Sequence, residues 1–278
     1  MNEHVLIEPA GKRRLFFFPF LSIRWPSVPV RRWQRAAVAL SLLAWSLPAA
    51  EGQAGAGIFA LRTMLQDKNP EIRIRAAEGL ARVGGREAVL ILRQGLSDPS
   101  IQVRTAAVKA LGFVGGRLAI TVISEALKDN SAEVRKRALE ALVRAGTVSS
   151  IPVIQKAFGD KEESVRLHAA LMLRKIGHRT SVAPLGRVLA TDKSPVVRAA
   201  AAEYLGKVGV KNPRSVVFLA KGLEDKEPLV RIKTVESLGF VQLRRAIPLI
   251  EKALQDKDSG VRIRATEVMG HTLAKDFE

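Results

Sequence analysis

Apolar and polar positions alternate along most of this chain in short blocks with helical spacing. The stretch 86–116 shows the pattern in full, because each of its halves places aliphatic residues on one helical face. The apolar positions are Ala88, Val89, Leu92 and Leu96 in the first half and Val103, Ala107, Leu111 and Val114 in the second. Between them, the tetrapeptide 97–100 (SDPS) has the composition of a tight turn. The pattern predicts two short helices joined by this turn.

The same pattern recurs seven times, and each copy contains an Asp followed six residues later by an Arg. The Asp positions are Asp67, Asp98, Asp129, Asp160, Asp192, Asp225 and Asp256, and the arginines are Arg73, Arg104, Arg135, Arg166, Arg198, Arg231 and Arg262. Successive Asp residues are 31, 31, 31, 32, 33 and 31 positions apart. A period of this size indicates a stacked array in which each unit covers the apolar face of its neighbour. We expect residues 55–278 to form one such array.

Three rows of residues in the second half of each repeat define the expected core. The first row is Ile72, Val103, Val134, Val165, Val197, Val230 and Val261; the second is Ala76, Ala107, Ala138, Ala169, Ala201, Thr234 and Ala265; the third is Leu80, Leu111, Leu142, Leu173, Leu205, Leu238 and Met269. A row restricted to Ala and Thr predicts that neighbouring helices approach closely there.

Residues at two other repeated positions predict where the second helices begin and end. The residue two positions after each Asp is expected to be the N-cap; these residues are Asn69, Ser100, Ser131, Glu162, Ser194, Glu227 and Asp258. A glycine closes five repeats, where we expect a left-handed C′ residue; these are Gly84, Gly115, Gly146, Gly177 and Gly209. The sixth and seventh repeats carry Gln242 and Leu273 instead.

The first fifty residues have a different character. Residues 1–30 form an N-terminal extension of uncertain role, whose broken apolar stretch suggests that translation starts near Val30. Residues 31–54 combine three arginines, an apolar run of twelve residues and a string of small residues, as a secretory signal peptide or a retained membrane anchor does. We therefore expect an exported protein, either periplasmic or extracellular or anchored to the membrane. N-terminal sequencing of the mature protein distinguishes cleavage from retention.

The array is basic and the chain has no cysteine. From residue 51 onward there are 38 Lys and Arg residues against 25 Asp and Glu residues, a net charge of +13. Without cysteine, neither disulfides nor thiolate metal sites are available. The excess positive charge allows a peripheral contact with an anionic membrane surface or with another polyanion.

The repeats resemble HEAT repeats, and specifically the short variety of about 31 residues found in phycobilisome bilin lyase subunits and in designed consensus repeat proteins. The phrases that carry the resemblance are DPSIQVRTAAVKALGFVGG, DNSAEVRKRALEALVRAG and DKSPVVRAAAAEYLGKVG. The resemblance covers about four-fifths of the chain and implies an all-α fold, a right-handed α-solenoid of about seven two-helix repeats. It implies no single activity, because one scaffold hosts many functions.

The repeated Asp and Arg residues are expected to form a structural ladder that ties the turns between the helices together, since a binding site needs particular residues at particular repeats. The solvent face of the second helix is expected to line the concave side of the solenoid and to bind a protein partner. The predicted partner-binding residues are Arg75, Arg82, Lys109, Phe113, Arg137, Arg144, His168, Leu171, Lys175, Lys207, Lys233, Phe240 and Arg264. Glutamates run between the basic residues, so charges should neutralise one another through i,i+3 and i,i+4 contacts. Phe113, Leu171 and Phe240 interrupt the charges and are candidate anchors.

Other functions fit the sequence less well. The acidic row and the scarcity of aromatic residues for stacking disfavour nucleic acid. Deoxyhypusine hydroxylases resemble this fold and bind two irons through His-Glu pairs, but none of His4, His168, His178 and His271 precedes a Glu. We identify no catalytic, cofactor-binding or metal-binding residue. The sequence predicts a non-enzymatic scaffold or adaptor; the alternatives are an accessory subunit of a modifying enzyme similar to bilin lyases and a polyanion-binding module.

The small-residue row can be tested with Ala138→Leu. The larger side chain should overpack the contact between neighbouring helices and cost roughly 1 to 3 kcal/mol of unfolding free energy. Urea denaturation measures this loss, and a variant as stable as the parent protein would show that the row does not face the core.

Overall fold

The computed structural model describes residues 51–275, and all the secondary structure in that range is helical. Residues from 53 onward form one compact unit, and the description concerns this unit. The signal peptide or anchor predicted at 31–54 lies almost wholly outside the described residues. No helix between residues 51 and 275 is both long enough and apolar enough to cross a membrane.

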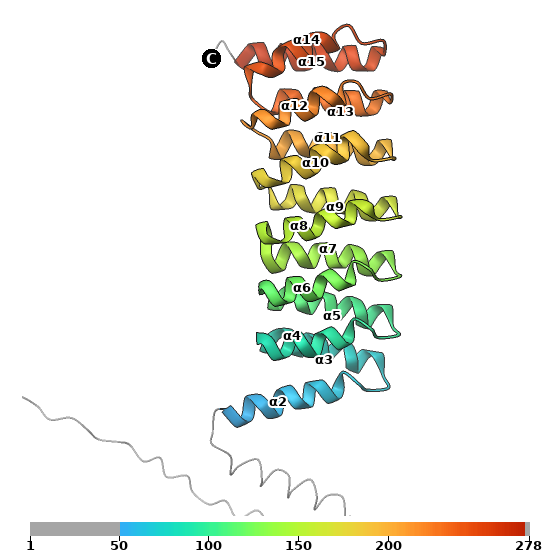
Figure 1. Cartoon of the computed structure of the whole chain (residues 1–278), viewed down its shortest axis with the longest axis vertical. Helices are drawn as coiled ribbons and strands as arrows, with labels where there is room; N and C mark the ends of the chain where they lie inside the picture. The colour runs from blue at the N-terminus through green and yellow to red at the C-terminus, as the bar shows by residue number, and fades with distance from the viewer. Residues whose placement is uncertain (1–50, 276–278) are drawn as a thin grey trace, which may run out of the picture. The chain divides into compact units, whose positions relative to one another are not determined.

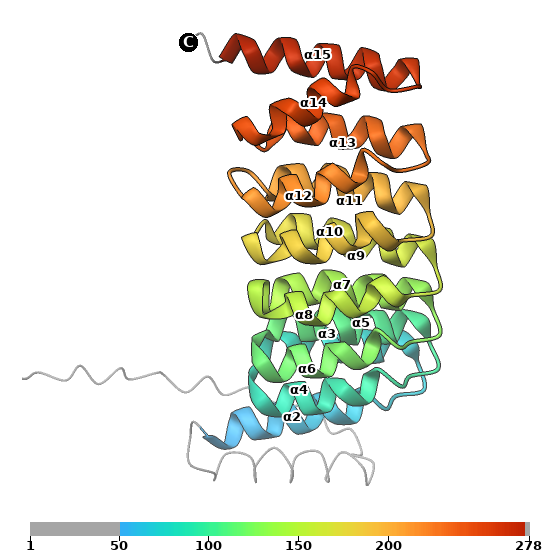
Figure 2. The same ribbon diagram turned by 45° about the horizontal axis from the view of Figure 1, so that its top comes forward.

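Seven helix pairs stack on one another in chain order to form a right-handed α-solenoid (Figures 1 and 2). The first helices of the pairs are α2 (Glu51–Met64), α4 (Gly85–Gly95), α6 (Gly116–Ala126), α8 (Ile151–Ile154), α10 (Val182–Thr191), α12 (Pro213–Gly222) and α14 (Ile247–Ala253). The second helices are α3 (Pro70–Val83), α5 (Ile101–Val114), α7 (Ala132–Gly146), α9 (Glu163–Ile176), α11 (Pro195–Val208), α13 (Pro228–Phe240) and α15 (Ser259–Lys275). Short 3-10 segments lie in the links: η1 (Thr147–Ser150), η2 (Gln155–Gly159), η3 (Arg179–Ser181) and η4 (Arg244–Ala246).

The three predicted rows of the second helices form the core. Every member of the Ala and Thr row is fully buried. The Val row and the Leu row are equally buried in the interior repeats, and only Ile72 in the first repeat and Met269 in the last are half-buried. These two exceptions lie at the ends of the stack, where one neighbouring repeat is missing. The prediction of the core is therefore confirmed.

The predicted left-handed closing residue is confirmed in three repeats. Gly84, Gly115 and Gly177 have φ between 65° and 70°, a range that side chains with a Cβ rarely adopt. In the sixth repeat Gln242 takes a similar φ of 53° without being a glycine. The turn geometry is thus kept there at a cost in backbone strain.

The same prediction is wrong at Gly146 and Gly209, whose φ values are −161° and −90°. At Gly146 the chain runs from α7 directly into η1, and a Cβ would collide with the side chain of Ile120. At Gly209 a Cβ would collide with Ser215, and the left-handed residue is Lys211, two positions later, with φ 56°. Glycine is therefore required at these two positions because a side chain would not fit. The sequence pattern had instead suggested that a left-handed backbone conformation required it.

The repeated Asp organises the turn between the two helices of each pair. In all seven repeats its Oδ1 accepts the backbone N–H of the predicted N-cap residue two positions later. The predicted N-cap side chains themselves cap the second helix only at Asn69, Ser194 and Asp258. The Asp therefore orders the turn in every repeat, including those whose N-cap side chain makes no such bond.

The repeated Arg pairs with the Asp of the following repeat. In the third repeat, Arg135 donates from Nε to Oδ2 of Asp160 at 2.6 Å and from Nη2 to Oδ1 at 2.9 Å. Its Nη1 donates to the backbone carbonyl of Asp129 at 2.8 Å, so one guanidinium joins two successive turns. The same geometry occurs at six contacts, which we call the ladder; the other five pairs are Arg73–Asp98, Arg104–Asp129, Arg166–Asp192, Arg198–Asp225 and Arg231–Asp256.

The contribution of the ladder can be measured with Arg135→Met. This variant leaves the buried carboxylate of Asp160 without its counter-ion, which should cost roughly 3 to 5 kcal/mol. The matched control is Arg262→Met, because Arg262 donates only to the carbonyls of Asp256 and Lys257 and should cost about 1 kcal/mol or less. Urea denaturation at neutral pH compares the two, and equal losses would refute the role of the carboxylate pairing.

The ladder should also make the fold sensitive to acid. Burial by itself raises the pKa of the ladder carboxyl groups, but hydrogen bonds from the guanidinium and the turn amide, together with nearby positive charge, outweigh it. The net pKa lies below the ordinary value at Asp98, Asp129, Asp160, Asp225 and Asp256. Each depressed pKa stabilises the fold above the unfolded value of about 3.9, and this stability is lost as the pH falls toward the folded pKa.

We therefore expect the urea midpoint to fall steeply below about pH 4. Asp160→Asn removes one titrating carboxyl, so this variant should be less stable at neutral pH and should lose less on acidification. The two denaturation curves should converge as the pH is lowered. A constant difference between them at all pH values would contradict a lowered pKa at Asp160.

Candidate functional site

The predicted partner-binding residues all lie on the second helices, and their side chains reach solvent. Nine are exposed: Arg75, Arg82, Lys109, Phe113, Arg137, Arg144, Lys175, Lys207 and Phe240. Four are half-buried: His168, Leu171, Lys233 and Arg264. Together with the intervening glutamates they form a continuous set, which we call the second-helix stripe.

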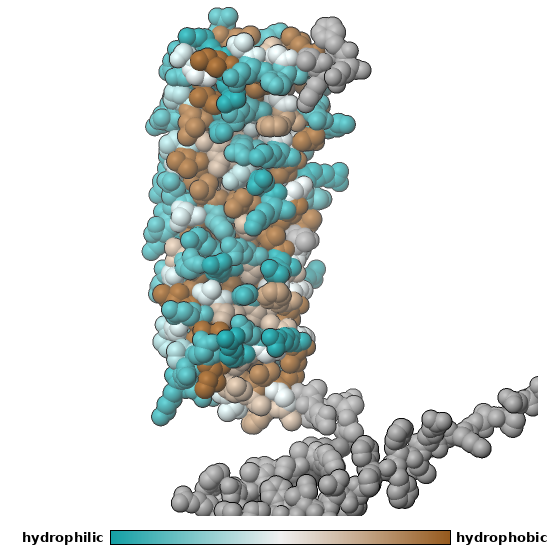
Figure 3. Space-filling view, turned by 180° about the vertical axis from the view of Figure 1, so that it is seen from behind, coloured by the Kyte–Doolittle hydropathy of each residue, from teal (hydrophilic) through white to brown (hydrophobic). Residues whose placement is uncertain are grey.

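Ion pairs within the stripe neutralise much of its charge, as the spacing predicts. The pairs between neighbouring turns of one helix are Arg75–Glu78 at 3.0 Å, Arg137–Glu140 at 3.0 Å, Lys207–Glu203 at 2.6 Å, Lys233–Glu236 at 2.9 Å and Arg264–Glu267 at 2.7 Å. Exposed pairs of this kind contribute little to stability. Their consequence is a surface of mixed charge; on the face drawn in Figure 3, hydrophilic and hydrophobic areas are likewise interspersed along the stack.

Two opposing effects act on the pKa of His168 in the stripe, its burial and the nearby carboxylate of Glu140. Its Nε2 lies 3.1 Å from Oε1 of Glu140, on the neighbouring repeat, in an orientation that does not make a hydrogen bond. Burial lowers the pKa of His168 below its ordinary value, and the negative charge of Glu140 offsets this effect only in part. The imidazole of His168 therefore gains a proton less readily than a fully solvated histidine does.

The three apolar residues of the stripe differ in how available they are. Phe113 is 53% exposed, but the guanidinium of Arg144 lies 4.3 Å from the centre of its ring. Leu171 is half-buried and packs against the core. Phe240 is 54% exposed and borders a hollow. Of the three predicted anchors, Phe240 therefore has the most accessible surroundings.

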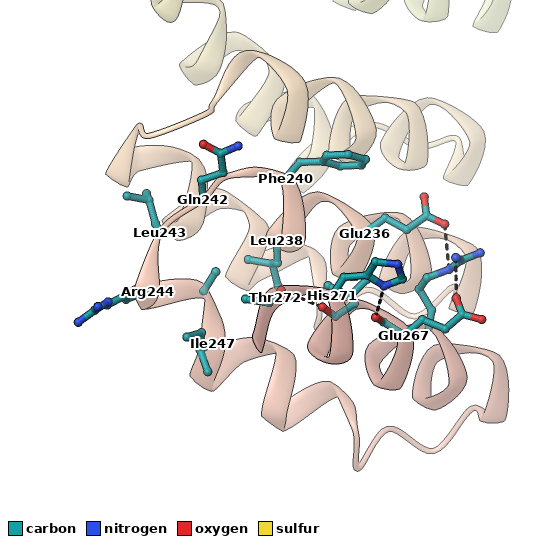
Figure 4. Close-up of a pocket in the computed structure, with 14 residues that line it drawn as sticks. Glu236, Leu238, Phe240, Gln242, Leu243, Arg244, Ile247, Glu267, His271 and Thr272 are labelled. Atoms are coloured by element: carbon teal, nitrogen blue, oxygen red, sulfur yellow. Dashed lines mark hydrogen bonds and ion pairs between the residues drawn. The ribbon is translucent and has the colours of Figure 1, made fainter. Parts of the chain in front are cut away.

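The hollow lies between α13, the link 241–246 and the second half of α15, and its volume is about 760 Å³ (Figure 4). Its apolar lining includes Leu238, Phe240, Leu243, Ile247 and Val268. Its polar lining includes Glu236, Gln242, Arg244, Arg264, Glu267, His271 and Thr272. An apolar floor with a charged rim suits an apolar side chain that is flanked by polar groups.

The hollow lies beside an irregular sixth link. Gln242 takes a positive φ, and the chain then passes through η4 before α14 begins. The first helix α14 has 7 residues, but α8 has only 4, so the length of the first helix alone does not account for the hollow. The apolar side chains of Leu238 and Val268 line it beside this link.

Arg264 organises the rim of the hollow. Its Nη1 lies 2.7 Å from Oε2 of Glu267, and its Nε lies 3.1 Å from Oε1 of Glu236 on the preceding helix (Figure 4). Nδ1 of His271 lies 2.7 Å from the backbone carbonyl of Glu267. A carbonyl oxygen only accepts, so Nδ1 carries the proton of this hydrogen bond and Nε2 faces away from it. The rim thus offers both carboxylates and cationic groups to a ligand.

The sequence identified part of this hollow. Phe240 and Arg264 are among the predicted residues, whereas Leu243, Ile247 and Val268 are not. The missing glycine at position 242 is the signal that marks the link as different. A second signal is Pro248, which lies in the first turn of α14 and marks where this helix begins. No three His, Asp or Glu side chains within residues 51–275 lie close enough together to hold a metal ion.

Several solved structures are similar to the described array. Kap121p aligns with 84% of this chain at 15% identity and a TM-score of 0.59, and the aligned part is 30% of Kap121p. The CpcE and CpcF complex of phycocyanin lyase from Nostoc sp. PCC7120 aligns with 54% of this chain and 97% of its own at 22% identity and a TM-score of 0.43. Human deoxyhypusine hydroxylase, in complex with glycerol, aligns with 78% and 97% at 20% identity and a TM-score of 0.42.

No curated protein sequence matches the chain. The family model of HEAT repeats matches at residues 59–142, 120–206 and 184–270, which together span nearly the whole described array. The seven stacked pairs, the buried rows and this match agree on one assignment. The chain belongs to the family of HEAT-repeat proteins.

Proposed function

We propose that this chain is a non-enzymatic scaffold that holds a protein partner along the second-helix stripe and anchors it in the hollow beside Phe240. The observation that carries the proposal is an accessible aromatic side chain next to an apolar hollow, on a surface of mixed charge. Exposed apolar surface rimmed by polar groups is typical of protein-binding sites. Membership of a repeat family built around extended surfaces supports the same function.

The packing of the second helices supports their placement on the inner side of a curved stack. A Cβ added to Gly112 would lie 2.9 Å from Cα of Ala141, so α5 and α7 approach to near backbone contact. The first helices α10 and α12 are instead separated by a large side chain, since Gly186 faces the ring of Phe218. Closer approach on one side favours curvature toward that side, which supports a concave second-helix stripe.

The chemistry of the hollow defines the partner segment. A large apolar side chain would fill the space over Leu238 and Val268, and polar groups of both signs would meet the rim formed by Glu236, Arg264 and Glu267. A polyanion is less well suited, because five of the nine basic residues of the stripe already have carboxylate partners. Binding to a protein partner should therefore depend only weakly on salt, whereas polyanion binding falls steeply as salt rises.

The anchor can be tested with Phe240→Ser. Loss of a buried aromatic anchor should weaken binding of the partner by about 2 kcal/mol or more, roughly thirtyfold. The matched control is Val217→Ser on α12, where an exposed apolar side chain lies outside the stripe. Circular dichroism should show equal helicity in both variants.

The measurement has two stages. Quantitative affinity purification from native extract first identifies proteins that the parent chain and Val217→Ser retain and Phe240→Ser loses. The dissociation constant of a purified candidate for the three chains then gives the size of the effect. Equal retention and equal affinity for Phe240→Ser and Val217→Ser would refute the anchor, and a steep salt dependence would favour a polyanion.

A further inference from the structure

At each end of the stack, one residue of the ladder has no ladder partner within the described array. Six arginines each pair with the Asp of the next repeat, so the first Asp and the last Arg are left over. Oδ1 of Asp67 accepts the backbone N–H of Asn69, and no guanidinium within residues 51–275 pairs with this carboxylate. Arg262 uses Nη1 for the carbonyls of Asp256 and Lys257, and its Nε and Nη2 meet no carboxylate of the described array.

The outer face of α15 repeats the stacking features of the interior helices. Gly112 and Gly206 lie against the next helix, at Ala141 and Ser237, whereas the corresponding Gly270 has nothing within 4 Å. Ile263 is 60% exposed, although the corresponding Leu167 and Ile232 are half-buried under the next repeat. We call the surface formed by Arg262, Ile263, Thr266, Gly270 and Leu273 the C-terminal end face.

The outer side of the first repeat has the complementary features. Phe59 is 70% exposed, and Met64 is also exposed. Ile72 is half-buried, while the other six members of its row are fully buried beneath a preceding repeat. We call the surface formed by Phe59, Met64, Asp67 and Ile72 the N-terminal end face.

We propose that a second copy of this chain stacks end to end on the first, with the C-terminal end face of one copy against the N-terminal end face of the other. Arg262 of one copy then forms a bidentate ion pair with Asp67 of the next copy, as the arginines of the interior ladder do with their Asp partners. The two ends are complementary and not self-complementary, because two Arg262 side chains would repel each other. The contact is heterologous, so it generates open chains of copies rather than closed dimers.

This inference goes beyond the proposed scaffold function and does not depend on it. The Phe240 hollow belongs to the second-helix stripe, and end-to-end stacking leaves that stripe continuous from one copy to the next. A partner could therefore bind whether or not the copies stack, and the two proposals can fail separately.

The test uses charge reversal at the two ends of the full-length chain, purified in a mild detergent. Sedimentation velocity over a range of concentrations should show the parent chain growing beyond a monomer. Asp67→Arg and Arg262→Asp should each raise the dissociation constant by roughly tenfold to a hundredfold, since each places like charges opposite one another. Each variant loses local hydrogen bonds, at the Asn69 amide or at the carbonyls of Asp256 and Lys257, but no ion pair of the described array, so both should stay folded with only a small loss of thermal stability.

Mixing the two variants provides the decisive step. In the mixture, Asp at position 262 meets Arg at position 67, and the unaltered Arg262 and Asp67 meet at the other contact, so alternating chains should form. Lys221→Asp on α12 is the control for the change in net charge and should associate as the parent chain does. A monomeric parent chain, undiminished association of the single variants, or a mixture that stays monomeric would each overturn the proposal. Undiminished association would assign self-association to another surface.

Discussion

In six of the seven repeats one guanidinium joins two successive turns, and the stack depends on this double contact. Arg135 donates to the carbonyl of Asp129 in its own turn and also donates to the carboxylate of Asp160 in the next turn. A buried charge pair is costly to desolvate, and a repeat scaffold can keep it only when most donors and acceptors are satisfied. Here the turn amide of Glu162 completes the coordination of Asp160. Nearest-neighbour coupling, which carries the cooperativity of any solenoid, thus has a specific chemical basis in this chain.

The core and the ladder differ in how far the sequence could predict them. Valine, alanine and leucine recur at fixed offsets, so the rows that contain Val134, Ala138 and Leu142 followed from periodicity alone. The ladder needed the stacked structure, because Arg135 is only six positions from Asp129 but 25 from Asp160. The recurrence of both residues predicted a ladder between the turns, and three-dimensional stacking decides its pairs by bringing the farther carboxylate opposite the guanidinium. Gly146 and Gly209 show the same limit, since the need for space beside Ile120 and Ser215 depends on tertiary contacts.

The candidate site arises where the repeats depart from their average. The stripe is present in every repeat, and its ion pairs follow from helical spacing. Only the last two repeats combine a left-handed Gln242, a short α14 and an exposed Phe240. The individual residues could be listed from the sequence, but the hollow depends on how the link 241–246 packs between α13 and α15, which periodicity does not describe.

The irregular spacing of the repeats shows how the scaffold tolerates change. The closing glycine and the next Asp are 14 residues apart from Gly84 to Asp98, 15 from Gly177 to Asp192 and 16 from Gly209 to Asp225. The Nε to Oδ2 distances at these three ladder contacts are nevertheless 2.6, 2.8 and 2.6 Å. Insertions are absorbed between the closing residue and the next turn, while the turns at the opposite edge of the stack keep their spacing (Figure 1). One edge of the stack, which carries the ladder turns, is therefore regular. The opposite edge, which carries the links between repeats, accepts insertions. New binding features can be added at the second edge while the ladder contacts are kept.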